Sequence, residues 1–255
     1  MPAVAIVIPM RNEAPNVARV LRGVAAACEG TDHEIVVVDD GSTDGTGAAV
    51  QAMASELAQL RLLAHEASAG QSAAVHTGVL AAHAPIVCTM DGDGQNPARE
   101  LPRLYGPLLG GPGRLGLVAG QRVGRRDTAS KRLASRAANA IRRRILSDGT
   151  RDTGCGLKAF RRDAFLSLPY FDHMHRYLPA LFARDGWEIR LVDVAHRERF
   201  AGRSNYTNLQ RALVGFHDLI GVAWLIRRRK RARVLPEGSA AGPAAPRAEP
   251  ESRTA

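Results

Sequence analysis

The sequence of 255 residues has few cysteines and no long hydrophobic run. Its three cysteines, Cys28, Cys88 and Cys155, are far apart and match no spacing of metal ligands, which argues against a disulfide framework or a zinc site. No stretch reaches the roughly 18 to 20 apolar residues that a transmembrane helix needs. The first residues read as a strand rather than as a charged leader with an apolar core, so we expect no signal peptide. A reducing, cytoplasmic setting fits these absences.

Acidic residues are outnumbered, because 25 Asp and Glu stand against 35 Lys and Arg and give a formal net charge of +10. Such an excess is typical of proteins with anionic partners, namely nucleic acid, phosphorylated substrates or an acidic membrane face. A solvated basic surface is the alternative. Aromatic residues make up only 5% of the chain, and no nucleic-acid-binding motif is present. Both observations argue against a basic nucleic-acid-binding module.

Short segments rich in Val and Ile alternate with Ala-rich segments of helical spacing over the first 120 residues. The expected strands are 4–8, 34–39, 60–65, 86–90 and 117–120, and the expected helices are 16–27, 46–58, 71–82 and 98–109. This alternation predicts an α/β fold with a mainly parallel central sheet covered on both faces. No G-x-G-x-x-G follows the first strand, so NAD binding is not expected.

The character of the chain changes after residue 120. A basic segment, 122–144, ends in a helical pattern. The loop at 152–156 leads into residues 157–160, and a late strand is expected at 187–194. Residues 209–226 read as a largely apolar helix, which a polybasic block at 227–231 follows directly, and the composition from 236 onward predicts disorder. We therefore divide the chain into a catalytic domain at 1–208, an interfacial helix with its polybasic segment at 209–235, and a disordered tail at 236–255.

An acidic cluster follows the fourth expected strand. Asp91, Asp93 and Gln95 alternate along the chain, so in an extended segment their oxygens face one point. Carboxylate and amide oxygens suit a hard divalent cation, Mg²⁺ or Mn²⁺, which would bridge the oxygens of a diphosphate. An acidic turn held by local hydrogen bonds is the structural alternative. Because ligands bind at the carboxyl ends of parallel strands, the position favours a metal site.

Two more polar clusters follow the first and second expected strands. Asp39 and Asp40 end a strand, and Ser42, Thr43 or Asp44 is expected to cap the helix that begins near Thr46. One strand-end carboxylate would in addition accept a hydrogen bond from a base or a ribose hydroxyl. Three residues at the end of the first strand could line the same pocket: Pro9, Arg11 and Glu13.

These three clusters, in this order, resemble the family 2 glycosyltransferases of the GT-A fold. Within that family the chain is similar to dolichol-phosphate mannose synthase and its bacterial polyprenyl-phosphate relatives. The motifs that carry the resemblance are Ile8–Glu13, Val36–Thr46, Asp91–Pro97, Asp152–Lys158 and Gly202–Tyr206. The resemblance covers roughly residues 3 to 226, and five motifs in order make it specific.

The resemblance implies a nucleotide-diphosphate-sugar site with a divalent cation, Mg²⁺ or Mn²⁺. It places Pro9, Arg11, Glu13 and Asp40 around the nucleotide, with Asp39 at the same strand end. Asp91 and Asp93 would face the diphosphate, with Asp93 and Gln95 as metal ligands. Asp91 would be a further ligand or would contact the ribose or a metal-bound water. The chain departs from the family at three positions, with Arg11 for a frequent tyrosine, Gly92 for alanine and Asn205 for lysine.

The acceptor that the resemblance implies is a polyprenyl phosphate, dolichyl or undecaprenyl. Its oxygen is already ionised at neutral pH, so direct inverting displacement needs no base, only alignment and charge compensation. The residues that we expect to bind this phosphate are Arg122, Lys131, Arg132, Arg136 and Arg203. A solvated basic helix face is the alternative. Two roles remain open for Asp152, which either positions acceptor or sugar as a catalytic residue or caps the turn that follows it.

The C-terminal helix is expected to lie at the membrane interface. Apolar residues at helical spacing precede the polybasic block, an arrangement typical of peripheral, monotopic attachment to the cytoplasmic face of a membrane. His217 and Asp218 argue against a span through the bilayer. A helix packed on the domain and followed by a solvated charge run is the alternative.

The main hypothesis is a hexosyltransferase that uses a GDP- or UDP-linked sugar, and two other functions are alternatives to it. A transferase acting on a hydroxyl acceptor in cell-envelope glycan synthesis would carry an acidic base, often a Glu-Asp pair, on a late loop, and residues 150–180 contain none. The Q-x-x-R-W signature of processive synthases is also absent. A further alternative is an inactive scaffold. The presence of Asp91, Asp93 and Gln95 argues against it, because a scaffold would not need all three. The sequence does not identify the sugar.

Overall fold

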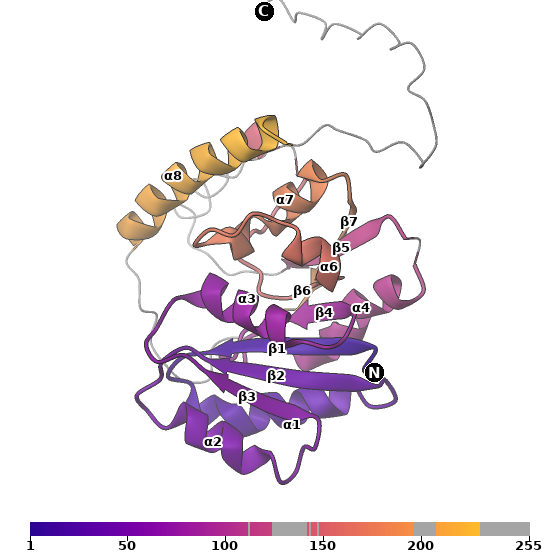
Figure 1. Cartoon of the computed structure of the whole chain (residues 1–255), viewed down its shortest axis with the longest axis vertical. Helices are drawn as coiled ribbons and strands as arrows, with labels where there is room; N and C mark the ends of the chain where they lie inside the picture. Colours follow the sequence, from indigo (N-terminus) through magenta and orange to yellow (C-terminus); the bar gives the residue numbers. More distant parts are fainter. Residues whose placement is uncertain (112, 124–141, 143, 147, 196–207, 230–255) are drawn as a thin grey trace, which may run out of the picture.

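The computed structural model describes residues 1–111, 113–123, 142, 144–146, 148–195 and 208–229, and within the last range the side chains of 208–214 and 216 are not described. These residues form a sheet with helices on both faces (Figure 1). The strands are β1 (Val4–Met10), β2 (His33–Asp39), β3 (Leu60–Ala64), β4 (Ile86–Thr89), β5 (Leu115–Arg122), β6 (Lys158–Arg161) and β7 (Glu188–Val194).

The helices alternate with the strands through the first half of the chain. The α-helices are α1 (Val17–Ala27), α2 (Thr46–Met53), α3 (Gln71–Ala81), α4 (Leu101–Leu109), α6 (Arg162–Leu166), α7 (Leu178–Arg184) and α8 (Asn208–Arg227). Three short 3-10 helices are η1 (Ala14–Asn16), η2 (Ala98–Glu100) and η3 (Met174–Arg176). The sequence located β1 to β5, β7, α1, α3, α4 and α8 to within a few residues, and α2 ends five residues early. It did not assign β6, α6 or α7.

The strand order across the sheet is β3-β2-β1-β4-β6-β5-β7. Neighbouring strands are parallel except at β6, which pairs antiparallel with both β4 and β5. The prediction of a mainly parallel α/β sheet is thus confirmed. The antiparallel strand inserted between β4 and β5 was not predicted, because a strand's local pattern does not determine which strands it pairs with.

Two hydrophobic layers enclose the sheet. Alternate residues of each strand point to opposite faces, so Ile6 and Ile8 of β1 pack with α1, α2 and α4, whereas Ala5 and Val7 pack with α3, α6 and α7. Figure 1 shows α1 and α2 below the sheet and α3 above it. Because both faces are covered, the central strands are apolar along almost their whole length.

Helix α8 covers the same face as α3, α6 and α7. Its Val222 is buried, and the Arg184 side chain of α7 donates a hydrogen bond to the carbonyl of Leu225 at 3.0 Å. The other side of the helix is open, with Ile220 and Trp224 exposed to 56% and 58%. Within the described residues, no helix combines the length and the apolar character that crossing a bilayer requires.

Candidate active site

The three polar clusters meet at one edge of the sheet. Strands β2, β1 and β4 are adjacent and parallel, so their carboxyl ends lie side by side. The backbone N–H of Asp40 donates to Met10 O at 2.8 Å, and that of Met90 donates to Val7 O at 3.2 Å. Parallel pairing therefore brings together residues separated by as many as 80 positions in the sequence, as the rule for open α/β sheets predicts.

Side chains join the first cluster to the second. The Asn12 backbone N–H donates to Ser42 Oγ at 2.9 Å, and Asn12 Oδ1 accepts from the Thr43 N–H at 2.8 Å. The Glu13 N–H donates to Thr46 Oγ1 at 2.8 Å. Asn12 has φ 55°, a left-handed conformation that asparagine tolerates better than most residues. These bonds fix the two loops relative to each other.

Asp44 performs the expected capping. Its Oδ1 accepts hydrogen bonds from the backbone N–H and the hydroxyl of Thr46, the first residue of α2, although Gly45 occupies the formal N-cap position. The Oδ2 atom accepts from the N–H of Ala14 at 3.1 Å. Asp44 therefore ties α2 to the loop after β1 as well as starting the helix.

Asp40 is buried and holds the loop that precedes α3. Its Oδ1 accepts from His65 Nδ1 at 2.7 Å and from the Ala69 N–H at 2.8 Å, and its Oδ2 accepts from Ser68 Oγ at 2.8 Å and from the Gly70 N–H at 3.0 Å. Burial raises the pKa of this carboxyl, but these hydrogen bonds outweigh burial and hold the pKa below its usual value. Four donors use the full acceptor capacity of the carboxylate.

Asp39 has more capacity left than Asp40. Its Oδ1 accepts one hydrogen bond, from the Ser42 N–H at 3.0 Å. Its Oδ2 faces Gly47 on α2, where a Cβ would lie only 2.9 Å from that oxygen. Of the two strand-end carboxylates, Asp39 is therefore the one that has lone pairs for a ligand, whereas Asp40 is engaged by the protein.

Asp91 lies at the centre of the edge, just beyond β4. Its Oδ1 accepts from Gln71 Nε2 at 2.8 Å and its Oδ2 from Asn96 Nδ2 at 3.1 Å. Burial raises the pKa of the Asp91 carboxyl, and the nearby charge of Asp93 raises it further. A Cβ at Gly156 would overlap the Asp91 carboxylate, so only glycine fits at this position.

Asp93 and Gln95 form the turn beside Asp91. Asp93 is buried, with 8% of its surface exposed, and its Oδ1 accepts from the Gln95 N–H at 3.0 Å. Gly94 between them has φ 71°, and a Cβ there would overlap the guanidinium of Arg19 from α1. The Asp93 carboxylate is thus fixed on a tight turn, close enough to Asp91 for the two charges to interact.

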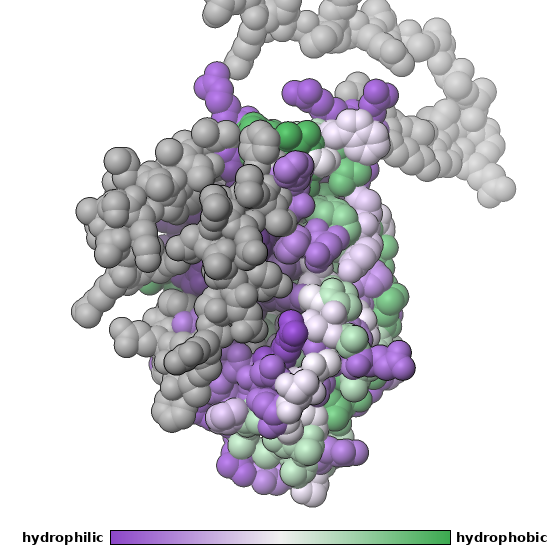
Figure 2. Space-filling model, turned by 90° about the vertical axis from the view of Figure 1, so that its left-hand side faces the viewer, coloured by the Kyte–Doolittle hydropathy of each residue, from purple (hydrophilic) through white to green (hydrophobic). Residues whose placement is uncertain are grey.

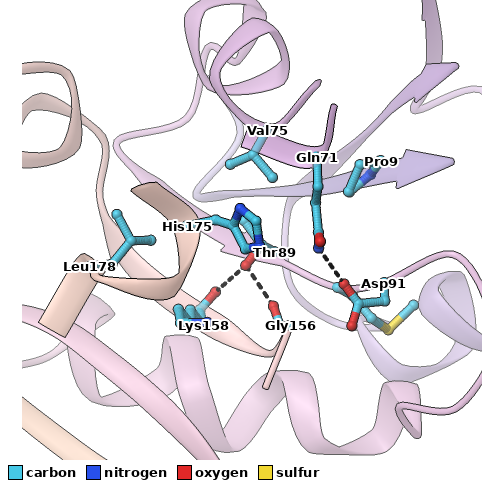
Figure 3. A pocket seen from close by; sticks show the side chains of 10 residues that line it. Pro9, Gln71, Val75, Thr89, Asp91, Gly156, Lys158, His175 and Leu178 are labelled. Carbon is cyan, nitrogen blue, oxygen red and sulfur yellow. Dashed lines mark hydrogen bonds between the residues drawn. The ribbon is translucent and has the colours of Figure 1, made fainter. Parts of the chain in front are cut away.

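A small pocket opens next to Asp91 (Figure 3). It is lined by Pro9, Gln71, Val75, Thr89, Met90, Asp91, Gly156, Lys158, His175 and Leu178. The enclosed part of this pocket is about 10 Å³, room for about one water molecule, and it opens to solvent at its mouth. Thr89 Oγ1 donates to Gly156 O at 2.8 Å, which fastens β4 to the turn before β6. The pocket therefore combines residues of β1, α3, β4, β6, η3 and α7.

The region beyond β5 is organised by an ion pair. Arg122 donates to both carboxylate oxygens of Asp152, from Nε at 2.5 Å and from Nη2 at 2.8 Å, with both side chains mostly buried. Asp152 Oδ1 also accepts from the Gly154 N–H at 3.1 Å. The buried Gln121 accepts from the N–H groups of Arg151 and Asp152 through its Oε1. The turn after residue 150 is thereby fixed against β5.

Comparison with known proteins identifies the family. The model of glycosyl transferase family 2 matches residues 5–168. The chain belongs to glycosyl transferase family 2. It is 36% identical over 214 residues to the undecaprenyl-phosphate 4-deoxy-4-formamido-L-arabinose transferase of Pseudomonas paraeruginosa, covering 81% of this chain and 61% of that protein. It is 32% identical over 232 residues to the dodecaprenyl-phosphate galacturonate synthase of Rhizobium johnstonii, covering 89% and 68%.

Solved structures confirm the GT-A fold. Glucosyl-3-phosphoglycerate synthase from Mycobacterium tuberculosis superposes with a TM-score of 0.65 at 23% identity, covering 89% of this chain and 80% of that one. A mannosyltransferase from Pyrobaculum calidifontis, solved with GDP-Man and Mn²⁺, gives 0.63 at 22% identity, covering 90% and 65%. At these identities the similarity establishes the fold alone.

For this family 2 member, the edge of the sheet gathers the residues predicted for the donor. Pro9 and Asp91 line one pocket, and Asp93 and Gln95 follow on the adjoining turn. Arg11 lies exposed on the loop that Asn12 anchors. The carboxylate of Glu13 accepts from Asn16 Nδ2 at 2.5 Å.

The residues predicted for the acceptor are placed differently. The Arg122 guanidinium donates to Asp152, and Asp152 also accepts from the Gly154 N–H, which agrees with the capping role, one of the two left open for it. Four predicted acceptor ligands lie outside the described residues: Lys131, Arg132, Arg136 and Arg203.

Sequence reasoning missed Gln71, Lys158 and His175 as pocket residues of this glycosyltransferase. Gln71 begins a helix, Lys158 belongs to a short strand, and His175 follows no motif. The one available signal was Lys158, a cation inside an apolar segment, because buried lysines are rare without a partner.

Proposed function

We propose that this protein transfers a sugar from a nucleotide diphosphate sugar to a polyprenyl phosphate. The observation that carries the proposal is the placement of Asp91, Asp93 and Gln95 at the carboxyl edge of a GT-A sheet, beside a pocket. Two relatives at 32% and 36% identity are named for polyprenyl-phosphate sugar transfer, and they support the acceptor class. The chain spans 61% of the length of the first relative, so the acceptor and the sugar are proposals.

A divalent cation, Mg²⁺ or Mn²⁺, fits the oxygen ligands that this edge offers. Burial raises the pKa of Asp91 and the charge of Asp93 raises it further, so a cation between the two carboxylates would stabilise the ionised form. Among the described residues, no three His, Cys, Asp or Glu side chains converge on one point. The chain would thus supply two carboxylates and the Gln95 amide, and a diphosphate would complete the coordination. Such a cation, when bound, would neutralise the charge of the departing diphosphate.

The chain's own residues would position the donor. We place the nucleotide against the loops after β1 and β2, where Asp39 retains free acceptor capacity and where Pro9, Arg11 and Glu13 lie close by. Asp40 would act indirectly by holding residues 65–70, which lead into Gln71. Gln71 and Asn96 would then fix the orientation of the Asp91 carboxylate.

The acceptor phosphate needs charge compensation rather than a base, because it is ionised at neutral pH. We assign that role to Lys131, Arg132, Arg136 and Arg203. Arg122 would support the same region through Asp152, with which it forms a bidentate pair. In this arrangement Asp152 positions the turn, and the attacking oxygen is the phosphate's own.

We also propose attachment to the cytoplasmic face of a membrane through α8. Ile220 and Trp224 are exposed on α8, and Arg227, Arg228 and Arg229 are exposed where it ends. Figure 2 shows hydrophobic residues beside strongly hydrophilic ones at the upper end of the molecule, where α8 lies. An apolar face next to a basic cluster binds an anionic lipid surface.

The test is lipid-linked product formation. The full chain is incubated with undecaprenyl phosphate, Mn²⁺ or Mg²⁺, and a panel of labelled GDP- and UDP-sugars, and the lipid is extracted. We expect one donor to give a labelled lipid that mild acid releases. Absence of labelled lipid with every donor, from a protein that still binds nucleotide diphosphates, would refute the acceptor.

A further inference from the structure

The pocket beside Asp91 contains hydrogen-bond donors that the protein does not use. His175, on η3, lines the pocket, and its Nδ1 lies 2.7 Å from Ser72 Oγ on α3. The His175 backbone N–H donates to the same Ser72 oxygen at 3.3 Å. The described residues offer the Ser72 hydroxyl proton no acceptor other than Nδ1, so Nδ1 accepts and the ring is neutral with its proton on Nε2.

The Nε2–H of His175 has no hydrogen-bond partner among the described residues. Figure 3 shows the ring beside Thr89 and Lys158 at the wall of the pocket. Burial lowers the pKa of His175 well below its usual value, and the charge of Lys158 lowers it further, which agrees with a neutral ring. His175 therefore presents one fixed N–H donor to the pocket.

Lys158 supplies the second set of donors. It is 4% exposed, and its ammonium donates one hydrogen bond, to Cys155 O. No carboxylate among the described residues forms an ion pair with it, and its other two N–H groups are unused. A buried ammonium is costly unless an anion or strong acceptor faces it. Lys158 is at the wall of the same pocket as His175.

The acceptors that line the pocket already take part in hydrogen bonds with other residues. The Asp91 carboxylate receives Gln71 and Asn96, and the Thr89 hydroxyl donates to Gly156 O. Pro9, Val75 and Leu178 complete the lining with apolar surface. A ligand that fills this space must bring its own acceptor oxygens to Nε2–H and to the ammonium.

We propose that the transferred sugar lies at the mouth of this pocket and that the pocket selects a sugar with a carboxylate or carbonyl substituent, one oxygen of which His175 Nε2–H and Lys158 bind. This inference rests on the proposed function, because it takes the diphosphate to lie at Asp91 and Asp93. A carboxylate oxygen would accept charge-assisted hydrogen bonds from the unused ammonium N–H groups, whereas the hydroxyl of a hydroxymethyl group in its place is an uncharged, weaker acceptor. His175 is then a specificity-determining residue, and Ser72 is the residue that positions it.

The experiment compares donors that differ only in that substituent. The full chain is titrated, in the presence of Mn²⁺, with two pairs of donors: UDP-galacturonate and UDP-galactose, and UDP-glucuronate and UDP-glucose. UDP and GDP alone are titrated as references. We expect one uronate to bind about 10-fold or more tightly than its neutral partner, the usual range for a charge-assisted hydrogen bond. The pocket variants should bind UDP or GDP alone as tightly as the wild type does.

The variants separate donation from packing. His175→Ala should weaken uronate binding about 3- to 10-fold, and His175→Gln, which can place an amide N–H near the Nε2 position, should restore most of it. Lys158→Gln should reduce the preference for the uronate. His76→Gln is the matched control, because His76 is a partly buried histidine on α3 that packs on Phe165 and Tyr170 and does not line the pocket.

Three outcomes would overturn the inference. The first is equal binding of the uronate and the neutral sugar by the wild type. The second is a loss of preference in His76→Gln as large as in His175→Ala. The third is that the pocket variants weaken binding of UDP and of the UDP-sugar equally, which would place phosphate in the pocket. The binding assay contains no lipid, so it is independent of the acceptor. A uronate preference without lipid-linked product would refute the proposed acceptor alone, and lipid-linked product without the preference would refute this inference alone.

Discussion

The carboxylates on the two halves of the sheet are held by different partners. At the carboxyl ends of β2, β1 and β4, Asp40, Asp44 and Asp91 accept hydrogen bonds from backbone N–H, hydroxyl, amide and imidazole groups. No arginine or lysine that the structure describes bonds to these three carboxylates. On the other half, beyond β5, three carboxylates pair with arginines, in Asp152–Arg122, Asp148–Arg142 and Asp193–Arg151.

Because of this difference, the first half of the sheet is able to bind a cation, whereas the carboxylates of the second half stabilise turns. Hydrogen bonds from neutral donors orient a carboxylate without cancelling its charge, so the first half retains negative charge where a cation would sit. An arginine pair cancels the charge and leaves a rigid, neutral connection. The first half is therefore suited to a metal and a diphosphate, and the second half fixes the framework on which the basic segment starts.

The largest effect is expected at the metal turn. Asp93→Asn keeps the shape but removes one charge from the proposed cation site, and we expect transfer to fall about 100- to 1,000-fold. Initial rates of lipid-linked sugar formation across a Mn²⁺ titration measure it, with thermal unfolding as the control for folding. Activity within a factor of two of wild type would mean that the first half does not hold the cation through Asp93.

Gly156 tests the contact between the two halves. A Cβ at this position would overlap the Asp91 carboxylate, so Gly156→Ala should displace Asp91 at a cost of about 1 to 3 kcal/mol and reduce transfer correspondingly. Gly110→Ala is the matched control, because a Cβ there meets nothing within 4 Å. If both variants lose the same activity, the effect is not specific to Asp91.

The Arg122–Asp152 pair tests the structural assignment of the second half. Arg122→Ala leaves Asp152 without its bidentate partner, and we expect unfolding free energy to fall by about 1 to 3 kcal/mol. The double variant Arg122→Ala with Asp152→Ala should be less destabilised than the sum of the single variants.

Arg136→Ala should instead weaken use of the acceptor and leave donor binding nearly intact. Equal loss of donor and acceptor use in Arg136→Ala would refute its assignment.

The sequence predicted the first half of the sheet better than the second. Parallel strands that alternate with helices have a local signature, so the shared edge of the three polar clusters followed from their order alone. The placement of β6 did not, because its antiparallel pairing depends on partners about 40 and 70 residues earlier in the chain. For the same reason, the overlap of Gly156 with Asp91 could not be anticipated.

Each pocket side chain that was given a role lies in a motif, but lying in a motif was not sufficient, because Lys158 ends the Asp152–Lys158 motif and was given no role. Pro9 and Asp91 were named in advance, whereas Gln71, Lys158 and His175 were not given roles. Convergence of side chains from α3, β6 and η3 is a property of packing and leaves no periodic trace in the sequence. The engagement of Arg122 by Asp152 likewise required the structure, since the two residues belong to different predicted segments.

Asp40 tests whether hydrogen bonds from neutral donors also stabilise the first half. Folding lowers the pKa of Asp40, so its contribution is complete above the unfolded pKa, near 4, and is lost as pH falls through the folded value. Asp40→Asn should lower the unfolding free energy by about 1 to 2 kcal/mol at pH 7, and the difference should shrink below pH 4. Urea unfolding at both pH values measures it, and a difference independent of pH would contradict the assignment.

The smallest effect is expected on α8, which covers the second half. Trp224 is 58% exposed, so Trp224→Ala should leave the unfolding free energy within about 0.5 kcal/mol of wild type. The same change should weaken binding to anionic phospholipid vesicles about 3- to 10-fold, because the indole contributes apolar area at the interface. Val222→Ala is the opposite control, because Val222 is buried, and it should lower stability without a direct effect on vesicle binding. Truncation after Asn208 should release the protein from membranes, and a truncated chain that still sediments with them would show that α8 is not the attachment site.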